Sequence, residues 1–201
     1  MPTAKLALMT RPTEFVVIDV ETSGFDPGCA RVLSLAALTA TADGTVVDCM
    51  HTLLNPGVDP GPTDIHGLTA PMLDGYPDFA DITAQLVPIL RDRILVAHNA
   101  GFDYAFLAAE AHRCDTELPV TNALCTLDLA SRLDLGLDSL SLAALAAHFG
   151  VAQARPHDAL DDARVLAELL PHLLRCATQR GIALPIRAAA TLPPVLLRSA
   201  A

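Results

Sequence analysis

The chain has 201 residues, of which 52% are hydrophobic, so it is long enough to bury a sizeable core within a single domain. Its net charge of −10, with Lys5 as the only lysine, argues against a protein that binds long nucleic acid through a basic surface. The acidity either serves solubility alone or indicates that a nucleic-acid substrate is short or is presented by a partner.

Two other properties of the composition bear on location and cofactors. No apolar run reaches the roughly 18 to 20 residues that span a bilayer, and residues 1–12 have the pattern of neither a signal peptide nor an anchor. The five cysteines are scattered and form no C-x-x-C pair, so they predict neither a disulfide framework nor a zinc site. These features favour a cytoplasmic protein without a membrane contact.

The first predicted element is a strand that ends in two acids. Residues 15–18 are apolar and predict a strand buried on both faces, and Asp19 and Glu21 follow with a spacing of two. In a strand this spacing points both carboxylates to the same side, where a cation is needed to offset their charge. Thr22, Ser23 and Gly24 then predict a tight, hydroxyl-rich turn whose backbone N–H groups can approach a ligand.

Two further strands are predicted over residues 31–40 and 45–54, joined by an Asp-Gly hairpin turn at 42–44. They extend the first strand into an antiparallel meander. A Pro- and Gly-rich loop follows and leads to His66, which is either a structural loop residue or a substrate contact. Residues 79–91 then predict a helix that is kinked at Pro88.

A short buried strand is predicted over residues 94–97, followed by a helix that Asn99 caps and that carries Phe102 inward. Asp103 falls in the first turns of this helix, where it either stabilises the helix dipole or joins the other acids. A further strand is predicted over residues 122–129. The next helix is capped by Ser139 or Ser141, runs through residue 148 and stops at residue 150.

The last long helix is predicted over residues 158–180. On a helical wheel, Asp162 shares a face with the apolar side chains and is expected to point toward the core, whereas Asp161 is expected to face water. His157 is expected on the loop that leads into this helix. It is either a surface histidine or a group suited to proton transfer.

These predictions give four inward-leaning carboxylates, on Asp19, Glu21, Asp103 and Asp162. At about 4 Å, like charges repel by roughly 4 kcal/mol at an effective dielectric constant near 20, and divalent cations remove that cost. Hard oxygen ligands favour two Mg²⁺ (or Mn²⁺) ions, which suit in-line displacement at a phosphodiester. His157 would then take the proton from the attacking water.

At this point the motifs resemble a known family. VVIDVETSGF, LVAHNAGFDYAFL and HDALDDA, with IHGLT, CTLDLA and SLSLAALAAHFGV between them, resemble the DnaQ-like DEDDh 3′–5′ exonucleases. The resemblance covers roughly residues 13–180, and it is strongest for the epsilon proofreading subunit of bacterial DNA polymerase III, with RNase T as a near competitor. Ser23 replaces a threonine that is common in the first motif.

The resemblance implies a fold and a set of roles. The fold would be α/β and RNase H-like, with a mixed five-stranded sheet (three antiparallel strands, then parallel additions) flanked by helices. Asp19, Glu21 and Asp162 would hold the first metal ion, with Asp19 bridging to the second and Asp103 reaching it through water. A second group of residues would meet the 3′-terminal nucleotide: Thr22, His66, Asn99 and Phe102, beside Ser23 and Gly24 of the turn.

The resemblance also divides the chain into an N-terminal extension (1–12), an exonuclease domain (13–180) and an Ala/Pro/Leu-rich tail (181–201), which is either disordered or a polymerase-docking segment. The first hypothesis for function is a metal-dependent 3′–5′ exonuclease that releases nucleoside 5′-monophosphates from single-stranded DNA. An exoribonuclease of RNase T type is the alternative, since no residue that reads a 2′-hydroxyl is identified. A catalytically silent RNase H-like module that binds a polymerase or nucleic acid is the alternative of another class.

Overall fold

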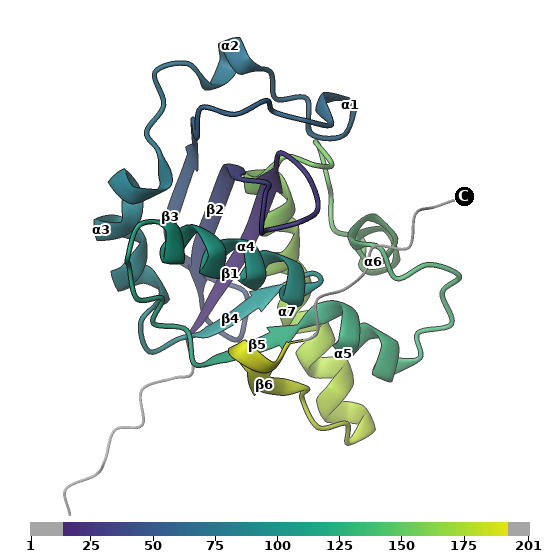
Figure 1. Cartoon of the computed structure of the whole chain (residues 1–201). Helices are drawn as coiled ribbons and strands as arrows, with labels where there is room; N and C mark the ends of the chain where they lie inside the picture. The colour runs from purple at the N-terminus through teal and green to yellow at the C-terminus, as the bar shows by residue number, and fades with distance from the viewer. Residues whose placement is uncertain (1–13, 193–201) are drawn as a thin grey trace, which may run out of the picture.

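A six-stranded mixed sheet forms the centre of the protein. The computed structural model describes residues 14–192, and its sheet has the strand order β3-β2-β1-β4-β5-β6 (Figure 1). The first three strands form the predicted antiparallel meander, whereas β4 and β5 run parallel to β1. The strands are β1 (Phe15–Thr22), β2 (Val32–Ala40), β3 (Val46–Leu53), β4 (Ile94–Ala97), β5 (Asn122–Cys125) and β6 (Ile186–Ala188).

The sixth strand corrects the predicted count of five. β6 lies within the segment assigned to the tail, and it pairs antiparallel with β5, with Ile186 opposite Leu124. β6 has only three residues, all of them exposed, and such a run is too short to be recognised as a strand from its periodicity. Residues 1–13 and 193–201, which include the predicted extension and the end of the predicted tail, lie outside the described residues.

Helices cover both faces of the sheet. One face packs against α3 and α4 and the other against α5, α6 and α7 (Figure 1). Val16, Ile18 and Val20 pack on the face that α3 and α4 cover, and Phe15 and Val17 pack on the face that α5, α6 and α7 cover. The helices are α1 (Thr63–His66), α2 (Ala70–Leu73), α3 (Phe79–Leu90), α4 (Ala100–Arg113), α5 (Thr126–Leu133), α6 (Leu142–Phe149) and α7 (Ala159–Arg180), with a 3₁₀ turn, η1 (Ala189–Thr191).

This alternation decides where the two acids of β1 go. Asp19 and Glu21 continue the series that begins with Phe15 and Val17, so they project from the sheet on the side that α7 covers. They do so at the end of β1, beyond the last hydrogen-bonded pair with β4. The fold therefore leaves the two carboxylates at a margin of the core, where other elements can approach them.

Several local predictions are confirmed. Ser141, rather than Ser139, caps α6 by accepting from the backbone N–H of Ala144 at 3.2 Å, and the helix ends at Gly150 with φ 73°. Pro88 lies inside α3 as expected.

Of the described residues, none belongs to a helix that is both long enough and apolar enough to cross a membrane.

Two local predictions are wrong. The strand expected over residues 122–129 ends at Cys125, because Leu129 and Leu133 are spaced for a helix and are buried on α5. Asn99 does occupy the N-cap position of α4, but its side chain makes no capping hydrogen bond. Its backbone is left-handed, with φ 80°, whereas a side-chain cap normally requires an extended backbone.

Candidate active site

The structure brings the four predicted acids together from three elements. Asp19 and Glu21 come from the end of β1, Asp103 from the first turn of α4, and Asp162 from the first turn of α7. All four line one cleft of about 310 Å³. The four acids are far apart in the sequence, and the packing of α4 and α7 at the end of β1 brings them together.

Burial raises the pKa values of these acids, and for Asp19 and Glu21 the neighbouring acids add to the effect. Burial raises the pKa of Asp19 well above its usual range, and repulsion from Asp103, Glu21 and Asp162 adds to the effect. Burial, followed by the charge of Asp162, raises the pKa of Glu21 to about 8. Burial likewise raises the pKa of Asp103 to about 8. Without a positive partner, part of the cluster would therefore be protonated at neutral pH.

The donor set fits divalent cations. Among the described residues that line the cleft, none is a lysine, an arginine or a cysteine, so no permanently charged cation neutralises the acids and no thiolate competes for a metal. Ligand atoms of Glu21, His157 and Asp162 lie within 4.8 Å of one another. Crowded carboxylate oxygens without a lysine or an arginine beside them are the environment in which Mg²⁺ or Mn²⁺ binds.

Asp162 points inward, as the helical wheel predicts. Its side chain is 8% exposed, and its two oxygens accept from the Gln153 amide at 2.7 Å and from the His157 backbone N–H at 3.1 Å. Burial raises its pKa, while these two hydrogen bonds act in the opposite direction. Asp162 is thus held in a fixed orientation by the segment that precedes α7.

The prediction that Asp161 faces water is wrong. Asp161 is only 9% exposed, because the segment before α7 folds back over it and donates two backbone hydrogen bonds to its carboxylate. A helical wheel describes only the angular position of a residue on its own helix. It contains no information about a loop that returns over the polar face.

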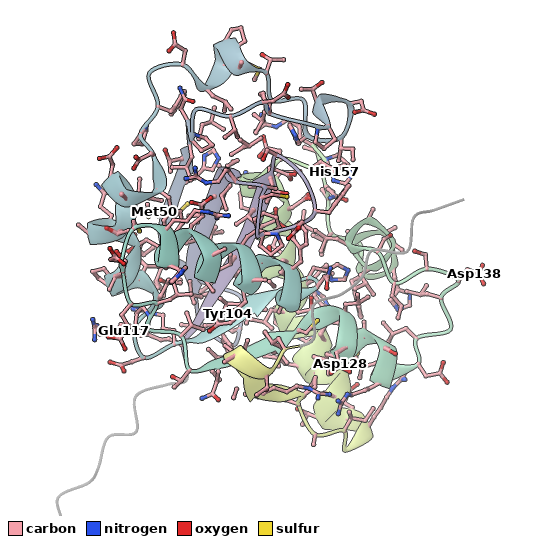
Figure 2. The ribbon with its side chains drawn as sticks, viewed as in Figure 1. Met50, Tyr104, Glu117, Asp128, Asp138 and His157 are labelled. Carbon is pink, nitrogen blue, oxygen red and sulfur yellow. The ribbon has the colours of Figure 1, made fainter. Side chains whose placement is uncertain are left out.

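His157 lies on the loop before α7, as expected. It is exposed, its backbone is left-handed with φ 63°, and Figure 2 labels it near the start of α7. Its imidazole lies within 4.8 Å of carboxylate oxygens of Glu21 and Asp162. An exposed imidazole at the edge of a carboxylate cluster can exchange protons with solvent while it contacts the cleft.

The turn after β1 is held by its own hydroxyl groups. The Thr22 hydroxyl donates to the Gly24 carbonyl at 2.7 Å, and the Ser23 hydroxyl accepts from the Arg31 backbone N–H at 2.9 Å. Gly61 of the Pro/Gly-rich loop lies against this turn, and a Cβ there would overlap the Ser23 carbonyl oxygen. Thr22 lines the cleft, whereas the hydroxyl of Ser23 is used to close the turn.

His66 has the structural role that the sequence allowed, and its contact with substrate stays a prediction. Its ring nitrogens contact the Pro60 carbonyl at 3.2 Å and the Leu68 backbone N–H at 3.0 Å, so it organises the loop. Burial lowers its pKa. His66 also lines the cleft, together with Asn99 and Phe102.

Asn99 is a half-buried residue of this wall whose side-chain hydrogen bonding is incomplete. Within residues 14–192 its side-chain oxygen is buried and has no hydrogen-bond partner. A buried acceptor without a partner is costly, so its presence in the wall of a cleft calls for a ligand or water that donates to it.

Phe25, Ile65 and His98 are among the lining residues of the cleft that sequence reasoning missed. Phe25 is 61% exposed and Ile65 is 42% exposed, which leaves apolar surface at the margin of an acidic cleft. His98 is largely buried, contacts the Thr126 hydroxyl at 3.0 Å, and has a pKa that burial lowers to about 4. The sequence contains each residue within a motif, but only the structure reveals which of them are exposed.

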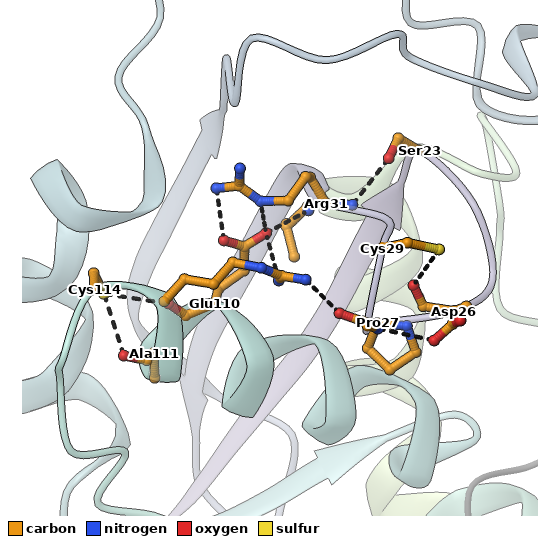
Figure 3. Close-up of polar contacts among 11 residues, drawn as sticks. Ser23, Asp26, Pro27, Cys29, Arg31, Glu110, Ala111 and Cys114 are labelled. Carbon is orange, nitrogen blue, oxygen red and sulfur yellow. Dashed lines mark hydrogen bonds and ion pairs between the residues drawn. The ribbon is translucent and has the colours of Figure 1, made fainter.

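An ion pair with a buried carboxylate and a half-buried arginine fastens α4 to the turn after β1 (Figure 3). Glu110, which is 1% exposed, accepts two hydrogen bonds from Arg31 at 2.8 and 2.9 Å and one from the Val32 backbone N–H at 3.1 Å. Arg113 lies 3.5 Å from the same carboxylate and donates to the Pro27 carbonyl. Because α4 also carries Asp103, this network fixes Asp103 relative to the turn that follows Asp19 and Glu21.

Comparison with known proteins agrees with this arrangement. The exonuclease family RNase T matches residues 16–170. The chain is 36% identical over 182 residues to the putative bifunctional exonuclease/endonuclease protein MT2247 of Mycobacterium tuberculosis (strain CDC 1551 / Oshkosh), which covers 86% of this chain and 28% of that protein. It is 35% identical over 173 residues to the PolC-type DNA polymerase III of Thermotoga maritima, covering 84% of this chain and 12% of that protein. The chain thus spans much less than half of either relative.

A relative of similar length is the DNA polymerase III subunit epsilon of Aquifex aeolicus, which is 32% identical over 162 residues that cover 80% of each chain. Among solved structures, exonuclease X in complex with 5′ overhanging duplex DNA superposes with a TM-score of 0.63 at 28% identity, covering 85% of this chain and 95% of that one. The nuclease domain of 3′hExo, a DEDDh family member, shares the fold with a TM-score of 0.71 at 14% identity, covering 89% of this chain and 98% of that one. Since the family match runs from β1 through the first half of α7, and so includes all four acids of the cleft, the chain belongs to the RNase T family of exonucleases, the DnaQ-like DEDDh group that its motifs resemble.

Proposed function

We propose that this exonuclease is metal-dependent, acts in the 3′–5′ direction on single-stranded DNA, and releases nucleoside 5′-monophosphates. The single observation that carries the proposal is the cleft in which Asp19, Glu21, Asp103 and Asp162 converge with His157 at its edge. Their mutual repulsion and raised pKa values are costs that two bound Mg²⁺ (or Mn²⁺) ions would remove.

In this proposal Asp19, Glu21 and Asp162 would hold one ion, and Asp19 and Asp103 would serve the second. When bound, such ions lower the pKa of an attacking water and stabilise charge on the leaving oxygen. His157 would accept a proton from the attacking water and pass it to solvent, to which its exposed side chain has access. Gln153 and the His157 backbone N–H keep the Asp162 carboxylate turned toward the cleft.

The remaining walls of the cleft suit the 3′-terminal nucleotide. Phe25, Ile65 and Phe102 offer apolar surface to a base, and base–aromatic contacts contribute about 1–3 kcal/mol each in single-strand binding. The side-chain oxygen of Asn99, which has no hydrogen-bond partner among residues 14–192, accepts a hydrogen bond from the nucleotide or from a water beside it. Thr22 and the turn through Ser23 and Gly24 lie against the same nucleotide.

A polymerase partner is part of the proposal, because the Aquifex relative is a subunit of DNA polymerase III. The net charge of −10 supports this view, since a chain with few cations gains little affinity from the backbone of a long substrate. An RNA substrate is the second candidate. It is favoured by the match to the RNase T family and by the rAMP bound to the 3′hExo nuclease domain.

The test uses DNA and RNA oligonucleotides labelled at the 5′ end, incubated with the full chain and Mg²⁺. We expect a ladder of shortened, still labelled DNA products and weaker shortening of RNA, and we expect Asp19→Asn to lower the rate by at least ~100-fold. Asp138→Asn is the matched control, because Asp138 is exposed and is far from His157 (Figure 2). Shortening of RNA alone would favour the exoribonuclease, and shortening of neither would leave a silent binding module.

A further inference from the structure

The loop that carries His157 is attached to α7 through Asp161. One carboxylate oxygen of Asp161 accepts from the backbone N–H groups of Ala154 at 2.8 Å and Arg155 at 2.7 Å. The Asp161 backbone N–H in turn donates to the side chain of Asp158 at 3.0 Å, the N-cap of the helix. These bonds join the segment before His157 to the first turn of the helix after it.

Asp161 is not placed to act as a ligand. It does not line the cleft that contains Asp162, and its carboxylate is not part of the group formed by Glu21, His157 and Asp162. A buried carboxylate beside another acid is unfavourable, since the charge of Asp161 adds to the factors that raise the pKa of Asp162. The two short hydrogen bonds from the loop compensate for the cost of burying the carboxylate. The contacts of Asp161 therefore indicate that its role is to hold this loop.

His157 depends on such an attachment because its own backbone is unfavourable. Its φ of 63° lies in the left-handed region that residues with a Cβ rarely adopt. Such a conformation persists only when the surrounding structure fixes it. His157 itself is attached to α7 by one hydrogen bond, from its backbone N–H to the Asp162 carboxylate at 3.1 Å. The bonds to Asp161 hold the chain immediately before His157.

We propose that Asp161 is a positioning residue that holds the loop of residues 153–157 so that the His157 imidazole stays beside Glu21 and Asp162. This inference rests on the proposed role of His157 as proton acceptor. It assigns Asp161 no contact with substrate or metal.

The experiment compares Asp161→Leu, which removes both acceptors, with Asp161→Asn, which keeps an oxygen for the two N–H groups. Glu168→Leu is the matched control, since Glu168 is exposed on the same helix. Hydrogen exchange of the Ala154 and Arg155 amides is measured without metal or substrate, and kcat and KM are measured with Mg²⁺. We expect Asp161→Leu to speed exchange of both amides by at least ~10-fold and to lower kcat by ~10- to 100-fold with KM nearly constant, while Asp161→Asn and Glu168→Leu stay near wild type. Asp161→Ala replaces the leucine variant should the latter fail to fold.

A double-mutant cycle with His157→Ala separates positioning from general stabilisation. If Asp161 acts through His157, adding Asp161→Leu to His157→Ala lowers kcat by less than ~2-fold further. A full additional loss in that background, or faster amide exchange with wild-type kcat, overturns the proposal. Failure of the proposed function is distinguishable, because His157→Ala alone would then leave kcat unchanged whatever Asp161 does.

Discussion

Without metal, the acidic cleft should make the folded protein less stable as the pH rises from 6.5 to 8. The folded-state pKa values of Glu21 and Asp103 are both raised to about 8, from ordinary values of 4.5 and 3.8. Between the ordinary and the raised value the folded chain binds protons that the unfolded chain has lost, so the free energy of unfolding falls with rising pH. The titration of His98 changes the free energy of unfolding in the opposite direction, because its pKa is lowered to about 4. That change is nearly complete at pH 6.5, the ordinary pKa of histidine.

The size of the effect follows from the two raised pKa values. Each pKa unit corresponds to about 1.4 kcal/mol, so one such carboxyl group costs about 2 kcal/mol between pH 6.5 and 8, and the pair costs about 2 to 4 kcal/mol because the groups titrate together. For a chain of this size, that is a fall in Tm of roughly 5 to 15 °C.

The assay is thermal unfolding followed by circular dichroism in EDTA at constant ionic strength. Glu21→Gln should flatten the slope, because the amide replaces one titrating carboxyl group, whereas Glu168→Gln on the exposed face of α7 should keep it. Mn²⁺ should reverse the slope, since a metal competes with protons for the same oxygens and binds more tightly at higher pH. A metal-free Tm that is constant or rises from pH 6.5 to 8 would refute the reasoning, as would an unchanged slope in Glu21→Gln.

Two further predictions concern how the cleft is held together. Glu110→Ala should lower the free energy of unfolding by about 2 to 4 kcal/mol in urea titrations, because it leaves the half-buried Arg31 guanidinium and the Val32 backbone N–H without their acceptor. Arg132→Ala at an exposed ion pair should cost less than about 1 kcal/mol, and equal effects would contradict the role of burial. Gly61→Ala should lower both stability and kcat/KM, because the new Cβ would force the Ser23 carbonyl away. Gly57 has a similar positive φ but open space around it, so Gly57→Ala should lower stability alone. Similar kcat/KM values for the two variants would show that the contact with the turn is unimportant.

Much of the fold was predictable because its elements have local signals. The apolar run before Asp19, the Asp-Gly turn between β2 and β3, and the apolar stripe of α7 each point to one structure. β6 was not predictable, since three exposed residues gain their structure only from the free edge of β5. The start of α5 at Thr126 was missed for a related reason, because a short apolar run fits a strand as well as a helix.

The sequence by itself determined which acids this protein has and, through strand alternation and the helical wheel, that Glu21 and Asp162 point inward. Only the tertiary structure decided that Asp161 is buried as well, and that Phe25 is left exposed at the margin of the cleft. The physical reason is that periodicity reports the direction of a side chain relative to its own element. Burial depends on which other segments arrive there, and loops that return from elsewhere in the chain leave no periodic signal.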